Sequence, residues 1–218
     1  MKTALVFGSS GLIGGHLLNE LIQSDNYNKI KLFVRSEHGS NHSKTEIIKT
    51  DFNNLENHKE DIKGDDCFFC IGTTKQNSPD KNEYKRVELD VPKKIAQIAK
   101  SNLVNSFVFV SSGYADPNSS GDYLKFKGLV EEELKRLSFS KLGIMRPSFL
   151  IGDRKEKRIG EKVGIFIFQL LSPLFLGPLK KMKPIHSKKV AKAMVKITNR
   201  DFKQNVFESN EIVEVSNS

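Results

Sequence analysis

The sequence predicts an α/β protein built on a doubly wound parallel sheet. Short apolar runs, typical of buried strands, alternate with helical patterns from the first residues to about residue 150. The first apolar run leads through closely spaced glycines into a helical pattern, which is the order strand, tight turn, helix. A chain of 218 residues is long enough to bury one sizeable core, so we expect a single domain over residues 1–218.

The first strand is predicted over Thr3–Phe7, and a glycine turn follows it. Gly8 allows the chain to turn sharply, Gly11 lets a diphosphate approach the backbone, and Gly14 lets the next helix pack close to the sheet. The apolar residues from Leu12 onward have helical spacing, and the start of that helix presents unpaired N–H groups to an anion. A glycine loop between a strand and a helix predicts a Rossmann-type dinucleotide-binding fold.

The second strand, Lys29–Val34, ends at Arg35 and Ser36, where the adenosine ribose lies in dinucleotide-binding folds. An acidic residue at this place holds the ribose 2′-hydroxyl, whereas an arginine accommodates a 2′-phosphate. The strand end carries no acidic residue, and Glu37 lies two positions beyond Arg35. The sequence therefore favours NADP(H) over NAD(H), with a plain surface arginine as the alternative.

A short third strand over Thr45–Lys49 leads to Asp51 and Phe52 at the cofactor edge of the sheet. Asp51 could accept hydrogen bonds from the adenine amino group, with Phe52 beside the ring. An equal alternative is that Asp51 caps a helical segment over Asn53–Lys59.

The fourth strand, Asp66–Ile71, contains Cys67 and Cys70 in a Cys-x-x-Cys spacing. Residues three apart on a strand face opposite sides of the sheet, and zinc would need two further ligands. We therefore interpret both cysteines as packing residues and expect no metal site. A glycine and two hydroxyl residues follow the strand and can lie against the second phosphate and its ribose. They are Gly72, Thr73 and Thr74.

The same alternation continues through the middle of the chain. A long helix is predicted over Tyr84–Ser101, a fifth strand over Ser106–Val110, a helix over Asp122–Leu137 and a sixth strand around Gly143–Met145. The pattern then changes, and we expect residues 152–204 to supply most of a small substrate-side lobe over the carboxyl ends of the strands.

Two helices are predicted in this C-terminal part. One covers Val163–Leu176, is mostly apolar and is interrupted by Pro173, and the other covers Ser187–Asn199. We interpret the apolar helix as a pocket lid or as the contact of a homodimer, with contact to a membrane surface as the less favoured alternative. Its apolar character suggests a hydrophobic substrate pocket.

Three residues near the fifth strand could perform acid–base chemistry. Ser112 lies just beyond the strand, and Tyr123 and Lys127 share one face of the following helix because they are four residues apart. A tyrosine phenol has an ordinary pKa of about 10. A nearby ammonium lowers that pKa and makes proton transfer feasible near neutrality. A serine hydroxyl can hydrogen-bond the substrate oxygen as its charge changes.

These motifs resemble those of the short-chain dehydrogenase/reductase superfamily. GSSGLIG looks like its GxxGxxG loop, YLKFK (Tyr123–Lys127) looks like its YxxxK motif, and VSS (Val110–Ser112) looks like the segment that bears its catalytic serine. Longer stretches are similar to the Tat-interacting-protein-like atypical branch and its bacterial NAD(P)H-binding or epimerase-like relatives. They read CIGTT, SSGYAD, KFKGLVEEEL, RPSFLIGDR and PIHSKKVAKAM.

The resemblance implies roles for individual residues. Ser112 would position the substrate oxygen, Tyr123 would act as acid or base, and Lys127 would bind the nicotinamide ribose. Arg35 would contact the 2′-phosphate. The predicted cofactor-binding residues are Gly8, Ser10, Gly11, Leu12, Ile13, Gly14, Arg35, Ser36, Asp51, Phe52, Gly72, Thr73, Thr74, Lys127, Arg146 and Pro147.

Together these patterns predict an NADPH-dependent reductase of a small, apolar carbonyl compound. The alternative is a non-catalytic NADP(H)-sensing protein of the same fold. The net charge of +9 is spread along the chain without a nucleic-acid-binding motif, so we expect no specific nucleic-acid partner. No apolar run reaches transmembrane length and no signal peptide precedes the first strand, which predicts a cytoplasmic location.

Overall fold

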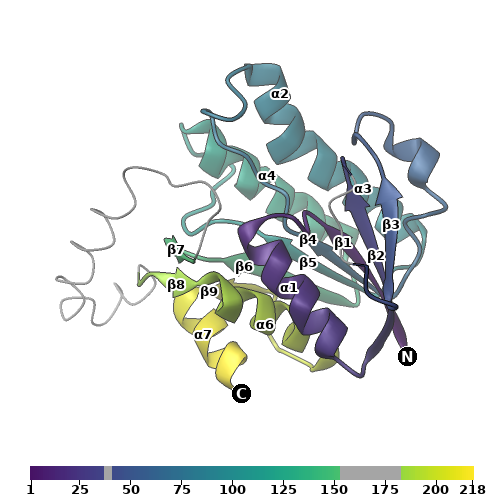
Figure 1. The fold of residues 1–218 in the computed structure, drawn as a ribbon. Coiled ribbons are helices and arrows are strands. Elements are labelled where there is room, and N and C mark those ends of the chain that lie inside the picture. The colour runs from purple at the N-terminus through teal and green to yellow at the C-terminus, as the bar shows by residue number, and fades with distance from the viewer. Residues whose placement is uncertain (37–40, 153–182) are drawn as a thin grey trace.

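The computed structural model describes residues 1–36, 41–152 and 183–218 (Figure 1). Within these residues, seven parallel strands form a central sheet in the order β3-β2-β1-β4-β5-β6-β9. From β1 the chain winds outward through β2 and β3, and then in the other direction from β4 to β9, so the predicted doubly wound Rossmann-type sheet is confirmed. The strands are β1 (Lys2–Phe7), β2 (Tyr27–Val34), β3 (Thr45–Lys49), β4 (Asp66–Phe69), β5 (Ser106–Val110), β6 (Lys141–Arg146) and β9 (Val206–Glu208).

Helices cover both faces of the sheet (Figure 1). One face carries α1 (Leu12–Gln23), α6 (Ser187–Asn199) and α7 (Ser209–Asn217). The other face carries α3 (Val91–Ser101) and α4 (Asp122–Leu137). Three shorter helical elements are η1 (Leu55–His58), α2 (Lys81–Lys85) and the π-helical turn η2 (Arg86–Asp90), and a separate parallel pair joins β7 (Leu150–Ile151) to β8 (Ile185–His186).

The strands are apolar on both sides, as parallel strands covered by helices on both faces require. Val6, Phe68 and Val108 pack in the layer that includes α1 and α6. The phenylalanines beside them in the sequence face the opposite layer, with α3 and α4, and they are Phe7, Phe69 and Phe109.

The two cysteines follow the same alternation. Cys67 is buried in the layer with α3 and α4, whereas Cys70 packs against the layer with α1 and α6. Burial raises the pKa of the Cys70 thiol to about 12, although Lys127 acts in the opposite direction. A thiol of this kind keeps its proton at neutral pH, which agrees with the interpretation of both cysteines as packing residues.

The lobe expected over residues 152–204 falls mostly on residues 153–182, which lie outside the described residues together with the apolar helix predicted over Val163–Leu176. The remaining helix, α6, has the predicted bounds and packs against α1 and β6 through Val190, Met194 and Ile197. Its apolar side chains at helical spacing therefore complete the helical layer of the sheet. Among the described residues, no helix combines the length and the apolar composition that a membrane span requires.

A buried polar cluster at the amino-terminal edge of the sheet connects α6 to the strands. The Tyr27 hydroxyl donates to Asp66 Oδ2 at 2.7 Å and lies 2.8 Å from Thr198 Oγ1. Lys2 Nζ donates to the same carboxylate oxygen at 3.0 Å and to the Thr198 carbonyl at 3.0 Å. Burial and the nearby Asp66 raise the pKa of Tyr27, so the hydroxyl remains a donor.

We expect Tyr27→Phe to lower the free energy of unfolding by about 1–3 kcal/mol, because it leaves a buried carboxylate and a buried hydroxyl without this partner. Chemical denaturation measures the change. Tyr114→Phe is the matched control, because Tyr114 is 61% exposed and the same substitution there should change stability by less than about 0.5 kcal/mol. Equal losses in the two variants would contradict a stabilising role of the cluster.

Candidate functional site

The glycine loop between β1 and α1 is built for a close backbone approach. Gly8 has a φ of +89°, in the left-handed region that favours glycine. A Cβ at Gly14 would lie 2.0 Å from the Gly8 carbonyl oxygen, so the first turn of α1 packs directly on the loop. Gly11 precedes α1 without a side-chain cap, which leaves the first N–H groups of the helix for another partner.

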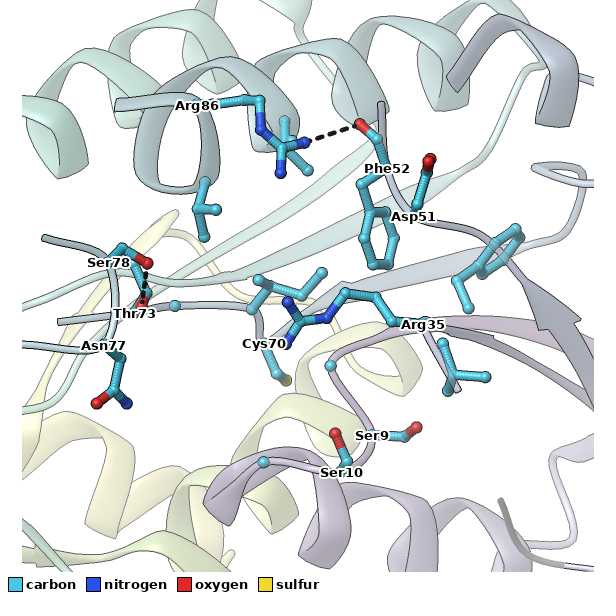
Figure 2. Close-up of a pocket in the computed structure, with 18 of the residues that line it drawn as sticks. Ser9, Ser10, Arg35, Asp51, Phe52, Cys70, Thr73, Asn77, Ser78 and Arg86 are labelled. Atoms are coloured by element: carbon cyan, nitrogen blue, oxygen red, sulfur yellow. Dashed lines mark hydrogen bonds between the residues drawn. The ribbon is translucent and has the colours of Figure 1, made fainter. Parts of the chain in front are cut away.

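A cleft of about 280 Å³ opens at the carboxyl edge of β1, β2 and β4 (Figure 2). The strand order reverses at this edge, and ligands of open α/β sheets bind at such a point. The cleft is lined by eight of the predicted cofactor-binding residues, namely Gly8, Ser10, Gly11, Arg35, Asp51, Phe52, Gly72 and Thr73.

The other lining residues were not predicted from the sequence to bind the cofactor, and one of them, Cys70, was interpreted as a packing residue. They are Ser9, Phe33, Val34, Cys70, Ile71, Asn77, Ser78, Glu83, Arg86, Val87 and Val91. The Ser9 hydroxyl is buried, and within the part of the chain that the structure describes it has no hydrogen-bond partner. An unsatisfied hydroxyl in the wall of a cleft is a group that a bound ligand can satisfy.

Two guanidinium groups lie at the end of the cleft predicted for the adenosine. Arg86 donates to both carboxylate oxygens of Glu83, at 2.7 and 2.8 Å, and to the Phe52 carbonyl at 3.4 Å. The hydrogen bonds within this pair lower the pKa of Glu83 and raise the pKa of Arg86. Figure 2 shows the Arg35 guanidinium reaching into the cleft below Arg86 and Phe52. Glu83 and Asp51 both line this end of the cleft, so its two cations face two carboxylates, and Arg86 is paired with Glu83.

Asp51 lies beside this end of the cleft, and Asn53 occupies both of its carboxylate oxygens. The Asn53 backbone N–H and side-chain Nδ2 each donate at 2.8 Å, and these bonds lower the pKa of Asp51. The helical segment that follows is the single 3-10 turn η1, with Asn54 as its N-cap, so Asp51 does not cap it.

Tyr123 and Lys127 lie together on α4, as their spacing predicted. Lys127 Nζ is 5.9 Å from the centre of the Tyr123 ring and donates to the Val110 carbonyl at 3.2 Å. The Lys127 side chain is 4% exposed, whereas Tyr123 is 39% exposed. A Cβ at Gly72 would lie 4.0 Å from Lys127 Nζ, so the ammonium adjoins the Gly72–Thr73 end of the cleft. That end lies opposite Asp51 and Phe52 (Figure 2).

Lys127 also forms a buried ion pair with Glu88, a residue that no sequence pattern had indicated. Lys127 Nζ lies 3.1 Å from Glu88 Oε2, and the Glu88 side chain is completely buried. Burial alone would lower the pKa of Lys127, but Glu88 and Tyr123 outweigh this effect and raise it. Lys127 is therefore an ammonium at neutral pH.

Ser112 follows β5, two residues beyond the carbonyl group that Lys127 contacts. Its partly exposed hydroxyl donates to the Gly113 carbonyl at 3.3 Å. The neighbouring Ser111 is buried and donates to Glu131 at 2.5 Å, and this hydrogen bond connects the end of β5 to α4.

The remaining predicted residues lie outside the cleft lining. Arg146 is paired with Glu131 at 2.6 and 2.9 Å and with Glu208 at 3.5 Å, so carboxylates of the protein itself neutralise its charge. Pro147 accepts the Gly113 N–H at 3.0 Å. The others are Leu12, Ile13 and Gly14 in the first turn of α1, Ser36 after Arg35, and Thr74, whose carbonyl accepts two N–H groups of the next loop.

The fold and the cleft together define a dinucleotide-binding protein of the Rossmann class. The chain belongs to the NAD(P)H-binding family, whose model matches residues 8–201. It is 34% identical over 166 residues to protein HTATIP2 of Rattus norvegicus, covering 73% of this chain and 67% of that protein. It is 30% identical over 210 residues to mitochondrial protein FMP52 of Eremothecium gossypii, covering 93% and 91%.

Solved structures share the fold at lower identity. UDP-N-acetylglucosamine 4-epimerase from Methanobrevibacter ruminantium matches with a TM-score of 0.71 at 20% identity, over 98% of this chain and 80% of that one. The oxidoreductase ylbE from Lactococcus lactis matches with a TM-score of 0.57 at 21% identity, over 70% and 71%. The resemblance to atypical dehydrogenase/reductase and epimerase-like proteins is thereby confirmed for family and fold.

Proposed function

We propose that the protein is an NADPH-dependent carbonyl reductase that uses Ser112, Tyr123 and Lys127 on a small, apolar carbonyl compound. The observation that carries this proposal is the Tyr123–Lys127 pair, whose ammonium adjoins the cleft at Gly72. A phenol that lies beside a buried ammonium and is itself accessible can transfer a proton to a bound substrate.

The residues of the cleft fit a dinucleotide. The backbone of the Gly8–Gly14 loop and the first turn of α1 would hold the diphosphate, with the unsatisfied Ser9 hydroxyl beside it. Asp51 and Phe52 would face the adenine, Arg35 and Arg86 a 2′-phosphate, and the Gly72–Thr73 end the second ribose. When bound, the cofactor supplies the hydride.

The three proposed catalytic residues then divide the acid–base work. Tyr123 donates its phenolic proton to the substrate carbonyl oxygen as that oxygen gains charge. Lys127, held by the Val110 carbonyl and Glu88, stabilises the phenolate that remains. The Ser112 hydroxyl donates a hydrogen bond to the same substrate oxygen and orients it.

Arg35→Ala is expected to weaken NADPH binding by about tenfold or more, because it removes a charge-assisted hydrogen bond to the 2′-phosphate. NADH binding should change by less than about twofold, since NADH has no phosphate at this position. Titration of both cofactors by fluorescence gives the two dissociation constants. Arg200→Ala, an arginine after α6, is the control for loss of one positive charge. Equal losses of NADPH and NADH affinity in Arg35→Ala would contradict the NADP(H) preference.

We further propose that the protein acts on a small-molecule substrate in the cytoplasm, although the FMP52 relatives are named as mitochondrial proteins. A homodimer is one assembly open to it. Fractionation of cells that express the tagged chain tests the location, and sedimentation of the purified protein tests the dimer.

A further inference from the structure

Glu88 lies on a π-helical turn inside a longer helical segment. α2, η2 and α3 run without a break from Lys81 to Ser101, and η2 is the turn in which the helix widens. π-helical turns are rare in proteins, and those that occur are often at functional sites. The extra residue in the turn changes which side chains face inward. Here Val87 and Val91 line the cleft wall while Glu88, between them, is buried against Lys127.

The Glu88 carboxylate connects the cleft to the proposed catalytic helix. Oε2 lies 3.1 Å from Lys127 Nζ, and Oε1 accepts the Thr73 backbone N–H at 2.5 Å. A Cβ at Gly72 would lie 3.5 Å from Oε1, so the chain after β4 passes directly over this carboxylate. One buried group thus fixes both the lysine and the Gly72–Thr73 end of the cleft.

The charged and titratable groups around this pair come from several elements. Besides Glu88, Lys127 faces Tyr123 on α4 and the protonated thiol of Cys70 after β4. Tyr84 of α2 lies near Tyr123 and Glu88, and burial raises its pKa to about 12, so it is neutral. Asp122 also lies nearby, but it is exposed and paired with Lys75 at 3.1 Å. Among the described residues, Glu88 is therefore the buried carboxylate that balances the Lys127 charge.

We propose that Glu88 is a positioning residue of the reductase site, which fixes Lys127 beside Tyr123 and balances the charge of the Lys127 ammonium. This inference rests on the proposed function, because the donor role belongs to Tyr123. An ammonium alone favours a phenolate, and a carboxylate on the ammonium opposes that effect. Reduction needs the protonated phenol, so loss of the Glu88 charge should narrow the pH range of reduction on its alkaline side.

The pH profile of turnover tests the charge balance. Glu88→Gln keeps the shape and an acceptor for the Thr73 N–H but removes the charge. We expect the alkaline limb of kcat to move to lower pH by about one unit, because both the phenol and the ammonium then lose a proton more readily. Asp90→Asn is the control on the same turn, since Asp90 is exposed and paired with Lys85 at 2.9 Å, and it should leave the limb in place.

Glu88→Asp tests the positioning separately, because it keeps the charge and shortens the side chain by one carbon. We expect an unmoved alkaline limb and a kcat lowered by about tenfold or more. A Glu88→Asp protein with wild-type kcat would overturn the positioning role.

NMR of the lysine side-chain nitrogens separates this inference from the proposed function, because it needs neither cofactor nor substrate. The Lys127 resonance, assigned with Lys127→Arg, should titrate at lower pH in Glu88→Gln than in the wild type. If that shift occurs and the wild type reduces no carbonyl compound, the reductase proposal fails while the coupling of Glu88 to Lys127 is supported. The opposite result is a wild-type enzyme that is active and a Glu88→Gln protein that is folded but shows the same Lys127 titration and the same alkaline limb of kcat. That result would overturn the role of Glu88.

Discussion

Tyr123→Phe is expected to lower kcat for NADPH-dependent carbonyl reduction by at least about a hundredfold while the protein stays folded and binds NADPH as before. The substitution removes only the hydroxyl that donates the proton and keeps the ring beside Lys127. Tyr123 is 39% exposed, so its hydroxyl is not needed to fill the core. The loss should therefore appear in kcat rather than in stability or in cofactor affinity.

The measurement is steady-state NADPH oxidation with a panel of small apolar aldehydes and ketones, together with NADPH titration and chemical denaturation of the same preparations. Tyr114→Phe removes a tyrosine hydroxyl from an exposed residue after β5 and should retain wild-type turnover. Full turnover by Tyr123→Phe would exclude the proposed mechanism. A wild-type protein that binds NADPH and reduces none of the panel would instead be assigned the sensing role.

Much of the fold could be predicted because its signals are local. β3, β5, α4 and α6 begin and end at the predicted residues, since each is a run of one periodicity bounded by polar or glycine residues. β9 could not be predicted in this way. It has three residues, and it is a strand because β6 offers an edge for pairing, which a short sequence window does not contain.

The site residues also fall into those that belong to a local pattern and those that depend on a distant partner. The glycine loop, Arg35 and the Tyr123–Lys127 pair are short-range patterns at strand ends or on one helix face, and they could be singled out. Glu88 could not, because its partner Lys127 is distant in sequence and belongs to another helix. One signal was present: Glu88 stands between apolar Val87 and Leu89 on a helix with a buried face. Its burial on the π-helical turn and its ion pair with Lys127 show that the carboxylate faces inward.

Arg86 illustrates the other limit of sequence reasoning. Arg86 and Glu83 are three residues apart on one helical segment, and their side chains form an ion pair of 2.7 Å. Arg86 also donates to the carbonyl of Phe52, which is distant in sequence and has a left-handed backbone with a φ of 63°. The place of Arg86 in the lining of the cleft therefore follows only from the folded chain.

Gly14→Ala is expected to combine a large loss of stability with a large loss of cofactor binding. Its Cβ would lie 2.0 Å from the Gly8 carbonyl oxygen and 2.8 Å from the Gly8 carbonyl carbon, which are backbone atoms that cannot rotate away. Gly8 itself packs closely on the chain after β4, since a Cβ at Gly8 would lie only 2.8 Å from the Ile71 nitrogen. The glycine loop therefore has little room to move away from α1. We expect a loss of about 1–3 kcal/mol or more in the free energy of unfolding.

The same strain should weaken NADPH binding by at least about tenfold, because α1 must shift relative to the loop whose N–H groups would hold the diphosphate.

Gly15→Ala is the matched control one residue later on the same helix. The nearest atom to its Cβ would be the Ser9 carbonyl oxygen at 3.7 Å, an ordinary contact. Alanine is favoured over glycine inside a helix by about 0.5–1 kcal/mol, so this variant should gain stability and keep its NADPH affinity. Denaturation and NADPH titration of the two variants should therefore give opposite signs for stability. A loss of both properties in Gly15→Ala would mean that α1 tolerates no added methyl group at its start, and would contradict a specific contact between Gly14 and Gly8.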